Sequence, residues 1–245
     1  MTQSVLPLIL ASGSPRRREL LDLMGLTYTV ETPDVDESFS GRPSETVMEI
    51  SRRKAAAVAA RHSDSIIIAA DTLVFADGAL GKPHTPERAK EMLRSLAGNW
   101  HHVYTGITVI NTRSGRVLRN VDKTRVHLVP MTEQEIDAYV ATGEPLDKAG
   151  AYGIQGMGGM FVDRIDGSYS NVVGLPMSML RIMLAQVGGV DERGVIWQVF
   201  NLFRRISRWI SARIIPAFTS RTRASSSTSL PWSSRGERGR AISLP

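Results

Sequence analysis

The chain has 245 residues, of which 42% are hydrophobic and 22% are charged, so it can bury a real core and is not disordered throughout. It contains no cysteine, which excludes disulfides, thiolate metal sites and a cysteine nucleophile. No apolar run approaches the roughly 20 residues that span a bilayer, and the first residues lack the charged start of a secretory signal. We therefore expect a cytoplasmic protein.

The net charge of +6 is concentrated at the C-terminal end of the chain. Residues 191–245 contain ten arginines, no lysine and three acidic residues, which gives this segment +7 and leaves −1 for the 190 residues before it. The body of the protein is therefore nearly neutral. Positive charge in an active site within that body must be local.

The N-terminal half alternates between predicted strands and helices. Residues 5–11 form a short, continuously apolar run, as in a strand that is buried on both faces. Ser14 and Pro15 then supply an N-cap and a first helical residue, and Gly25 ends that helix. Three elements follow: a helix over residues 43–61, a strand over residues 65–70 before Asp71-Thr72, and a helix from Thr85-Pro86 to about Gly98. This alternation favours a layered α/β sheet.

The next segments predict a β-hairpin followed by helices. Residues 102–110 and 117–129 are typical of two long strands joined by a turn at residues 111–115. Thr132 and Glu135 form a capping box for a helix that ends at Gly143, and a last core helix runs from Pro176 to Leu184. The sheet should therefore have both parallel and antiparallel parts.

The start of the first predicted helix is a candidate phosphate site. Ser14 is followed by Pro15 and three arginines, Arg16 to Arg18, in the first turn, where the helix dipole disfavours cations. A bound polyphosphate would compensate, because free backbone N–H groups and arginine forks converge there. The alternative is that the arginines extend into solvent and are partly offset by Glu19.

Lys54 lies in the apolar stripe of the second predicted helix, on the same face as Val47, Ile50 and Val58. A lysine in such a stripe either extends to the rim of the apolar face or places a cation at a cleft that faces phosphate. The sequence leaves both interpretations open.

Asp71 is the strongest catalytic candidate because it follows a buried strand, and open α/β sheets bind ligands at the carboxyl ends of their strands. Asp36 and Glu37 could supply a second carboxylate, and such oxygen ligands suit Mg²⁺ or Mn²⁺. The alternative is that Asp71 only caps a turn and that the other two are surface acids.

Other motifs are weaker or negative when each is considered alone. Lys82 lies in a GKP turn, and Gln155 lies in one of two glycine-rich runs between residues 148 and 176, whose groups suit a base and ribose. No P-loop precedes a helix. His101 and His102 are beside a strand without a nucleophile elbow, so we expect them to be structural or on the surface.

In combination these segments resemble the Maf family of nucleotide pyrophosphatases. The resemblance runs from about Leu8 to Leu184 and rests on the order ASGSPRR, VDE, a helical lysine, ADT, GKP, AYGIQG and GSYSNVVGLP. It implies a mixed α/β sheet with flanking helices of the Maf/ITPase-like type, an active site in a cleft, and commonly a homodimer. The ADT and YGIQG forms are similar to those of the branch that acts on dTTP and UTP.

The resemblance also implies site roles and a reaction. Ser12, Arg16, Arg17, Thr72 and Gln155 would bind substrate, Lys54 and Lys82 would neutralise phosphate, and Glu37 and Asp71 would bind Mg²⁺ or Mn²⁺ or activate water. Water would attack the α-phosphorus and release pyrophosphate, with Asp71 as the best candidate base. The cellular role would be sanitation of the nucleotide pool or restraint of septum formation, and nucleic acid would not be required.

We expect a Maf-like domain over residues 1–189 and a basic extension over residues 190–245 that matches no part of the family pattern. Residues 195–215 are amphipathic and rich in aromatic residues and arginine, as in a helix at a membrane interface or one packed on the body or a dimer mate. The Ser/Arg-rich end has too few apolar residues to fold. The alternative function is a nucleic-acid or division-complex binding protein that acts through this basic tail.

Overall fold

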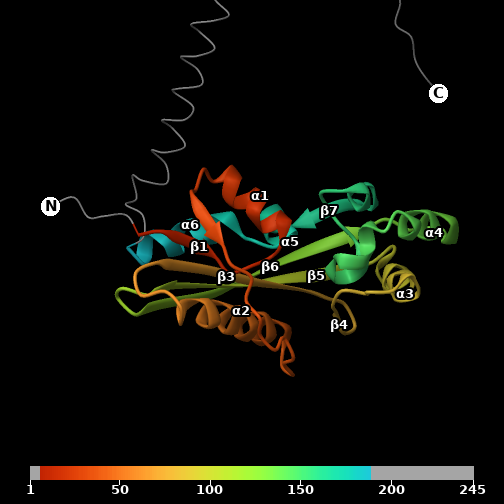
Figure 1. Cartoon of the computed structure of the whole chain (residues 1–245). Coiled ribbons are helices and arrows are strands. Elements are labelled where there is room, and N and C mark those ends of the chain that lie inside the picture. Colours follow the sequence, from red (N-terminus) through yellow and green to blue (C-terminus); the bar gives the residue numbers. More distant parts are fainter. Residues whose placement is uncertain (1–5, 189–245) are drawn as a thin grey trace, which may run out of the picture. The chain divides into compact units, whose positions relative to one another are not determined.

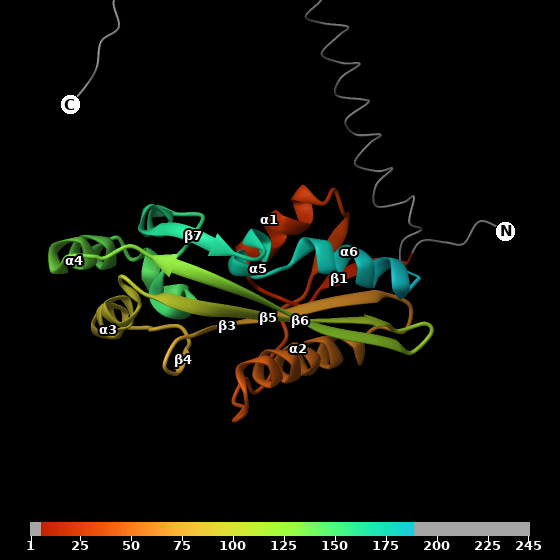
Figure 2. The same ribbon diagram turned by 180° about the vertical axis from the view of Figure 1, so that it is seen from behind.

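In the computed structural model, which describes residues 6–188, a mixed sheet carries helices on both faces (Figures 1 and 2). Six strands follow one another across this sheet, in the order β2 (Tyr28–Val30), β1 (Leu8–Leu10), β3 (Ile66–Phe75), β5 (Trp100–Asn111), β6 (Arg116–Leu128) and β7 (Val162–Asp166). A seventh, β4 (Ala79–Leu80), pairs with β3. Strand β1 is parallel to both of its neighbours, β2 and β3, whereas the pairs β3–β5, β5–β6 and β6–β7 are antiparallel.

The helices cover the sheet unequally. They are α1 (Pro15–Leu23), α2 (Pro43–Ala59), α3 (Pro86–Leu96), α4 (Glu133–Ala141), α5 (Tyr169–Val173) and α6 (Met177–Gln186). Helix α2 lies on one face, and α1, α5 and α6 lie on the other (Figures 1 and 2). Helices α3 and α4 pack at the opposite end of the long strands from α6 (Figure 1).

Buried apolar side chains fill the space between the sheet and each group of helices. Alternate residues of β1 and β3 point to opposite faces, so Leu8 and Leu10 pack with α1 and α6 while Ile9 packs with Ala55 and Val58 of α2. Strands buried on both faces explain the continuous apolar runs in the sequence.

The mixed α/β fold, the hairpin and the principal helices are confirmed. Thr85 caps α3, and Thr132 with Glu135 forms the predicted capping box of α4. The short elements β2, β4, β7 and α5 were not predicted, because two to five residues carry too little periodicity to be distinguished from loops. No helix between residues 6 and 188 has the length and apolar character of a membrane span. The predicted extension lies outside the described residues, so the domain division stays a prediction.

One sequence expectation about the central strand is wrong. Strand β3 does not end before Asp71 but continues to Phe75, with Asp71 opposite Gly106 of the antiparallel strand β5. The parallel partner β1 ends at Leu10, opposite Ile68, and β4 begins to pair only at Val74. In the described chain, residues 71–73 therefore have no strand neighbour on the β1 side. Asp71 lies beyond the carboxyl end of β1 rather than of its own strand.

Helix α2 approaches β5 unusually closely at Gly106. A Cβ atom on this residue would overlap the backbone of Val47 and lie 2.8 Å from the nitrogen of Met48. A buried hydrogen bond of 3.0 Å between the hydroxyls of Ser51 and Thr108 joins the same two elements. The glycine thus sets the distance between α2 and the sheet.

We expect Gly106→Ala to lower the free energy of unfolding by about 1–3 kcal/mol, because the added methyl group must displace the backbone of α2. Urea denaturation followed by circular dichroism would measure the loss. Gly78→Ala is the matched control, since a Cβ atom at Gly78 meets nothing within 4 Å. Equal stabilities of the two variants would contradict this account of the packing.

Candidate active site

A cavity of about 990 Å³ opens beside residues 71–73, on the side of β3 where β1 no longer pairs with it. Eight of the predicted site residues line it: Ser12, Arg16, Arg17, Glu37, Lys54, Asp71, Thr72 and Lys82. Gln155 instead lines a smaller cavity of about 110 Å³, which shares Arg16, Thr72 and Lys82 with the first. The structure therefore brings all nine residues to two adjoining cavities, although they come from positions 12 to 155 of the chain.

Lys54 lines the larger cavity and joins two of its carboxylates. Its Nζ atom lies 2.8 Å from Oδ1 of Asp71 and 2.9 Å from Oε1 of Glu37. The side chains of Lys54 and Asp71 are only 10% and 13% exposed, whereas that of Glu37 is 59% exposed. The lysine of the apolar stripe thus does not extend to a solvated rim but carries a buried charge. Removing one member of a buried pair is costly, because the other charge then remains without a partner.

Arg17 is turned into the protein instead of toward solvent. Its Nε donates to the carbonyl oxygen of Gly174 at 2.9 Å, and its two terminal nitrogens donate to the hydroxyls of Ser12 at 2.9 Å and Thr72 at 3.2 Å. Burial lowers the pKa of Arg17, and the nearby Asp71 carboxylate opposes this effect. These contacts leave two of its five N–H donors for a ligand.

Arg16 lies at the more exposed side of the same cavity. Its Nη1 atom is 3.2 Å from Oδ2 of Asp147, which also accepts a hydrogen bond of 2.8 Å from Lys148. Burial raises the pKa of Asp147, but the bonds from Lys148 and Arg16 outweigh burial and leave it lowered. The sequence analysis missed Asp147, although its position directly before the glycine-rich run was a usable signal.

The loop that carries Gln155 is organised by a second residue that the sequence analysis missed. Glu144 accepts hydrogen bonds from the Tyr139 hydroxyl at 2.8 Å and from the backbone nitrogens of Met157 at 2.9 Å and Gly158 at 3.1 Å. One carboxylate therefore fixes the turn that follows Gln155. No motif indicated it, because its partners are two backbone nitrogens and a tyrosine hydroxyl that folding brings close.

The donor set of the cavity fits a hard divalent cation that shares its coordination with a ligand. Between residues 6 and 188 there is no group of three or more His, Cys, Asp or Glu side chains that could hold a metal ion. Asp71 and Glu37, however, are close to the same lysine nitrogen. Mg²⁺ is commonly held by one or two carboxylates together with substrate phosphates and water. The two carboxylates of Asp71 and Glu37 suit this kind of metal binding.

His101 belongs to the core and not to the catalytic set. Its Nε2 atom is 2.8 Å from the Tyr152 hydroxyl, and the ring is 1% exposed. Burial lowers the pKa of His101 to about 4, so the imidazole is neutral at physiological pH. This agrees with the expectation that this histidine is structural.

The depressed pKa of His101 predicts a pH-dependent loss of stability. Between about pH 6.5 and pH 4 the unfolded chain binds a proton at this residue and the folded chain does not, so stability falls as the pH decreases through that window, by roughly 3 kcal/mol. His101→Gln, which cannot titrate, should show a smaller decrease than the wild type in urea melts at pH 7 and pH 4.5. Parallel decreases in both proteins would contradict the prediction.

Comparison with known proteins places the chain in a family. The sequence profile of the family described as Maf-like protein matches residues 7–187. A dTTP/UTP pyrophosphatase of Bacillus cereus (strain AH820) is 48% identical over 176 residues, which cover 71% of this chain and 91% of the relative. A dTTP/UTP pyrophosphatase of Geobacillus sp. (strain WCH70) is 49% identical over 174 residues, which cover 70% of this chain and 92% of the relative. The chain therefore belongs to the Maf-like protein family.

Proposed function

We propose that this protein is a nucleoside triphosphate pyrophosphatase that hydrolyses dTTP and UTP to the monophosphate and pyrophosphate. The observation that carries the proposal is the buried Lys54 with its two carboxylates at a cation-lined cavity. Relatives that are 48–49% identical are dTTP/UTP pyrophosphatases, and this supports the choice of substrates. These relatives offer no support for the alternative of a nucleic-acid or division-complex binding protein.

The charges of the cavity suit a triphosphate. Four cations line it, Arg16, Arg17, Lys54 and Lys82, against the three carboxylates Glu37, Asp71 and Asp147. The N-terminus of α1 adds free backbone N–H groups, with Ser12 and Ser14 beside them. The smaller cavity, where Gln155 and Thr72 offer an amide and a hydroxyl, would take the pyrimidine base.

In the proposed reaction, Asp71 accepts a proton from a water molecule whose oxygen attacks the α-phosphorus. The bond between the α-phosphorus and the bridging oxygen breaks, and pyrophosphate leaves with that oxygen and its electron pair. Lys54 holds Asp71 in place, and Lys82 and Arg16 bind the phosphate oxygens. Mg²⁺ or Mn²⁺ held by Asp71 and Glu37 would supply charge neutralisation on the phosphates. The homodimer and the cytoplasmic location stay predictions.

The test is pyrophosphate release from dTTP, UTP, ATP and GTP in the presence of Mg²⁺ or Mn²⁺. We expect turnover of the two pyrimidine nucleotides. Asp71→Asn should lower kcat by at least about 100-fold. Its melting temperature should fall, because Lys54 loses a buried charged partner, but circular dichroism at the assay temperature should still show the native fold. Asp77→Asn, an exposed acid in the turn after β3, is the control and should be fully active. Absence of turnover with every triphosphate would refute the proposed function, and an active Asp71→Asn protein would refute the role of this residue.

The C-terminal extension should not be needed for catalysis, because every proposed site residue lies between positions 12 and 155 and the last described helix ends at Gln186. A chain that ends at Gly189 should therefore keep the kcat of the full chain within about twofold, as for changes remote from a site. A folded but inactive shortened chain would show that the extension supports the site.

Contact of residues 190–245 with a membrane surface is a separate proposal, which rests on the arginines and aromatic residues of that segment. If it holds, only the full chain will co-sediment with anionic vesicles at low salt. Binding by the shortened chain, or none by the full chain, would remove it.

A further inference from the structure

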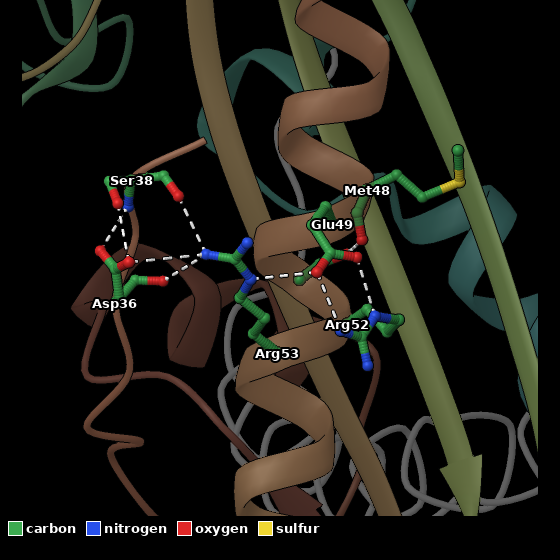
Figure 3. Close-up of polar contacts among 7 residues, drawn as sticks. Asp36, Ser38, Met48, Glu49, Arg52 and Arg53 are labelled. Atoms are coloured by element: carbon green, nitrogen blue, oxygen red, sulfur yellow. Dashed lines mark hydrogen bonds and ion pairs between the residues drawn. The ribbon is translucent and has the colours of Figure 1, made fainter. Parts of the chain in front are cut away.

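We propose that Arg53 is a positioning residue that holds the loop bearing Glu37 in the conformation in which its carboxylate reaches the active-site cavity. This inference rests on the proposed function for its catalytic consequence. The structural part, that one guanidinium fixes this loop, depends only on contacts of the described chain. Figure 3 shows Arg53 between helix α2 and the loop.

The loop needs an external anchor. Residues 31–42 form neither helix nor strand, and the side chain of Glu37 is 59% exposed. Fixing the backbone of one residue costs about 1–2 kcal/mol in conformational entropy, and an exposed ion pair contributes about 0–1 kcal/mol. The contact between Glu37 and Lys54 is therefore too weak to order the loop by itself.

Arg53 supplies the missing contacts. Its Nη1 atom donates to the carbonyl oxygens of Asp36 at 3.1 Å and Ser38 at 2.9 Å, the two residues on either side of Glu37. Its guanidinium also lies 5.8 Å from the centre of the Phe39 ring. The Asp36 carboxylate accepts bonds from the nitrogen and the hydroxyl of Ser38, which closes the turn. Arg53 thus fixes the backbone on both sides of Glu37.

The guanidinium is itself held by helix α2. Its Nε donates to Oε1 of Glu49 at 3.0 Å, one turn earlier in the helix. Hydrogen bonds from Arg52, and then from Arg53, lower the pKa of Glu49 to about 2, although burial acts against them. Glu49 is therefore ionised at physiological pH. Two neighbouring positions of α2 therefore hold Glu37. Lys54 pairs with the Glu37 carboxylate, and Arg53 binds the backbone on either side of Glu37.

Arg52 provides a matched control. It pairs with the same Glu49 through two hydrogen bonds of 2.8 Å, but no described contact joins it to the loop (Figure 3). Arg52→Met and Arg53→Met therefore each remove one arginine that pairs with Glu49, at adjacent positions of α2. They differ in whether the loop loses its anchor.

The experiment combines hydrogen exchange with kinetics on the full chain. In Arg53→Met, the backbone amide of Ser38, which donates to Oδ1 of Asp36, should exchange about tenfold faster than in the wild type, since the hydrogen bonds from the guanidinium to the loop are lost, while α2 and β3 keep their protection. For dTTP, kcat should fall about 10- to 100-fold with little change in KM. Arg52→Met should match the wild type in both measurements.

Two further variants keep the test decisive. Arg53→Lys retains the charge without the planar fork, so it should give intermediate exchange and kcat if the clamp is specific. In a Glu37→Gln background, Arg53→Met should lower kcat no further, because the loop has then lost the group that it positions. An additional full loss of activity there would show that Arg53 acts by another route.

The outcomes separate the clamp from the proposed function. Unchanged exchange of the Ser38 amide in Arg53→Met, or equal effects of Arg52→Met, would overturn the inference whatever the activity. If the wild type hydrolyses no triphosphate, the proposed function fails, but the exchange measurements still decide whether Arg53 fixes the loop. Faster loop exchange with an unchanged kcat would overturn the claim that the clamp serves Glu37.

Discussion

The buried ion pair between Lys54 and Asp71 is the interaction on which the rest of the site depends. It joins α2 to β3 in the interior, and its 2.8 Å length requires the helix to lie close to the sheet. Gly106, which faces the backbone of α2 and stands opposite Asp71 in the register, permits that approach. Separating two buried charges leaves each without compensation, at a cost of about 3–5 kcal/mol. The pair therefore constrains both the packing of the helix and the position of the candidate base.

Around this pair, the cavity concentrates charge in a body that is nearly neutral overall. The cations are held in two different ways. Arg16 and Lys54 are paired with carboxylates, so an anionic ligand competes with Asp147 and Glu37 for them. Arg17 is half-buried and uses three of its donors on Ser12, Thr72 and Gly174, so it shapes the cavity wall as well as adding charge. Such pre-positioned charge is what phosphoryl transfer requires of a protein.

Two loops complete the site, and each is fixed by a charged residue that is directed at the loop's backbone. Glu144 accepts from the nitrogens of Met157 and Gly158, just after Gln155, and Arg53 donates to the carbonyls on both sides of Glu37. A carboxylate suits free N–H groups, whereas a guanidinium suits free carbonyl oxygens. Without such contacts, a loop positions a catalytic group less precisely than a helix or strand does.

The α/β class, the hairpin, the main helices and the family could be inferred without coordinates, because periodicity, caps and ordered motifs are local properties of the chain. The sequence also indicated the nine residues that line the two cavities. The folded chain was needed to learn that Asp71 lies within a strand and that Lys54 bridges two carboxylates. It was also needed to find the contacts that Asp147, Glu144 and Arg53 make around the site. Their partners are backbone groups or residues brought close by folding, and such contacts leave no periodic or motif signal in the sequence.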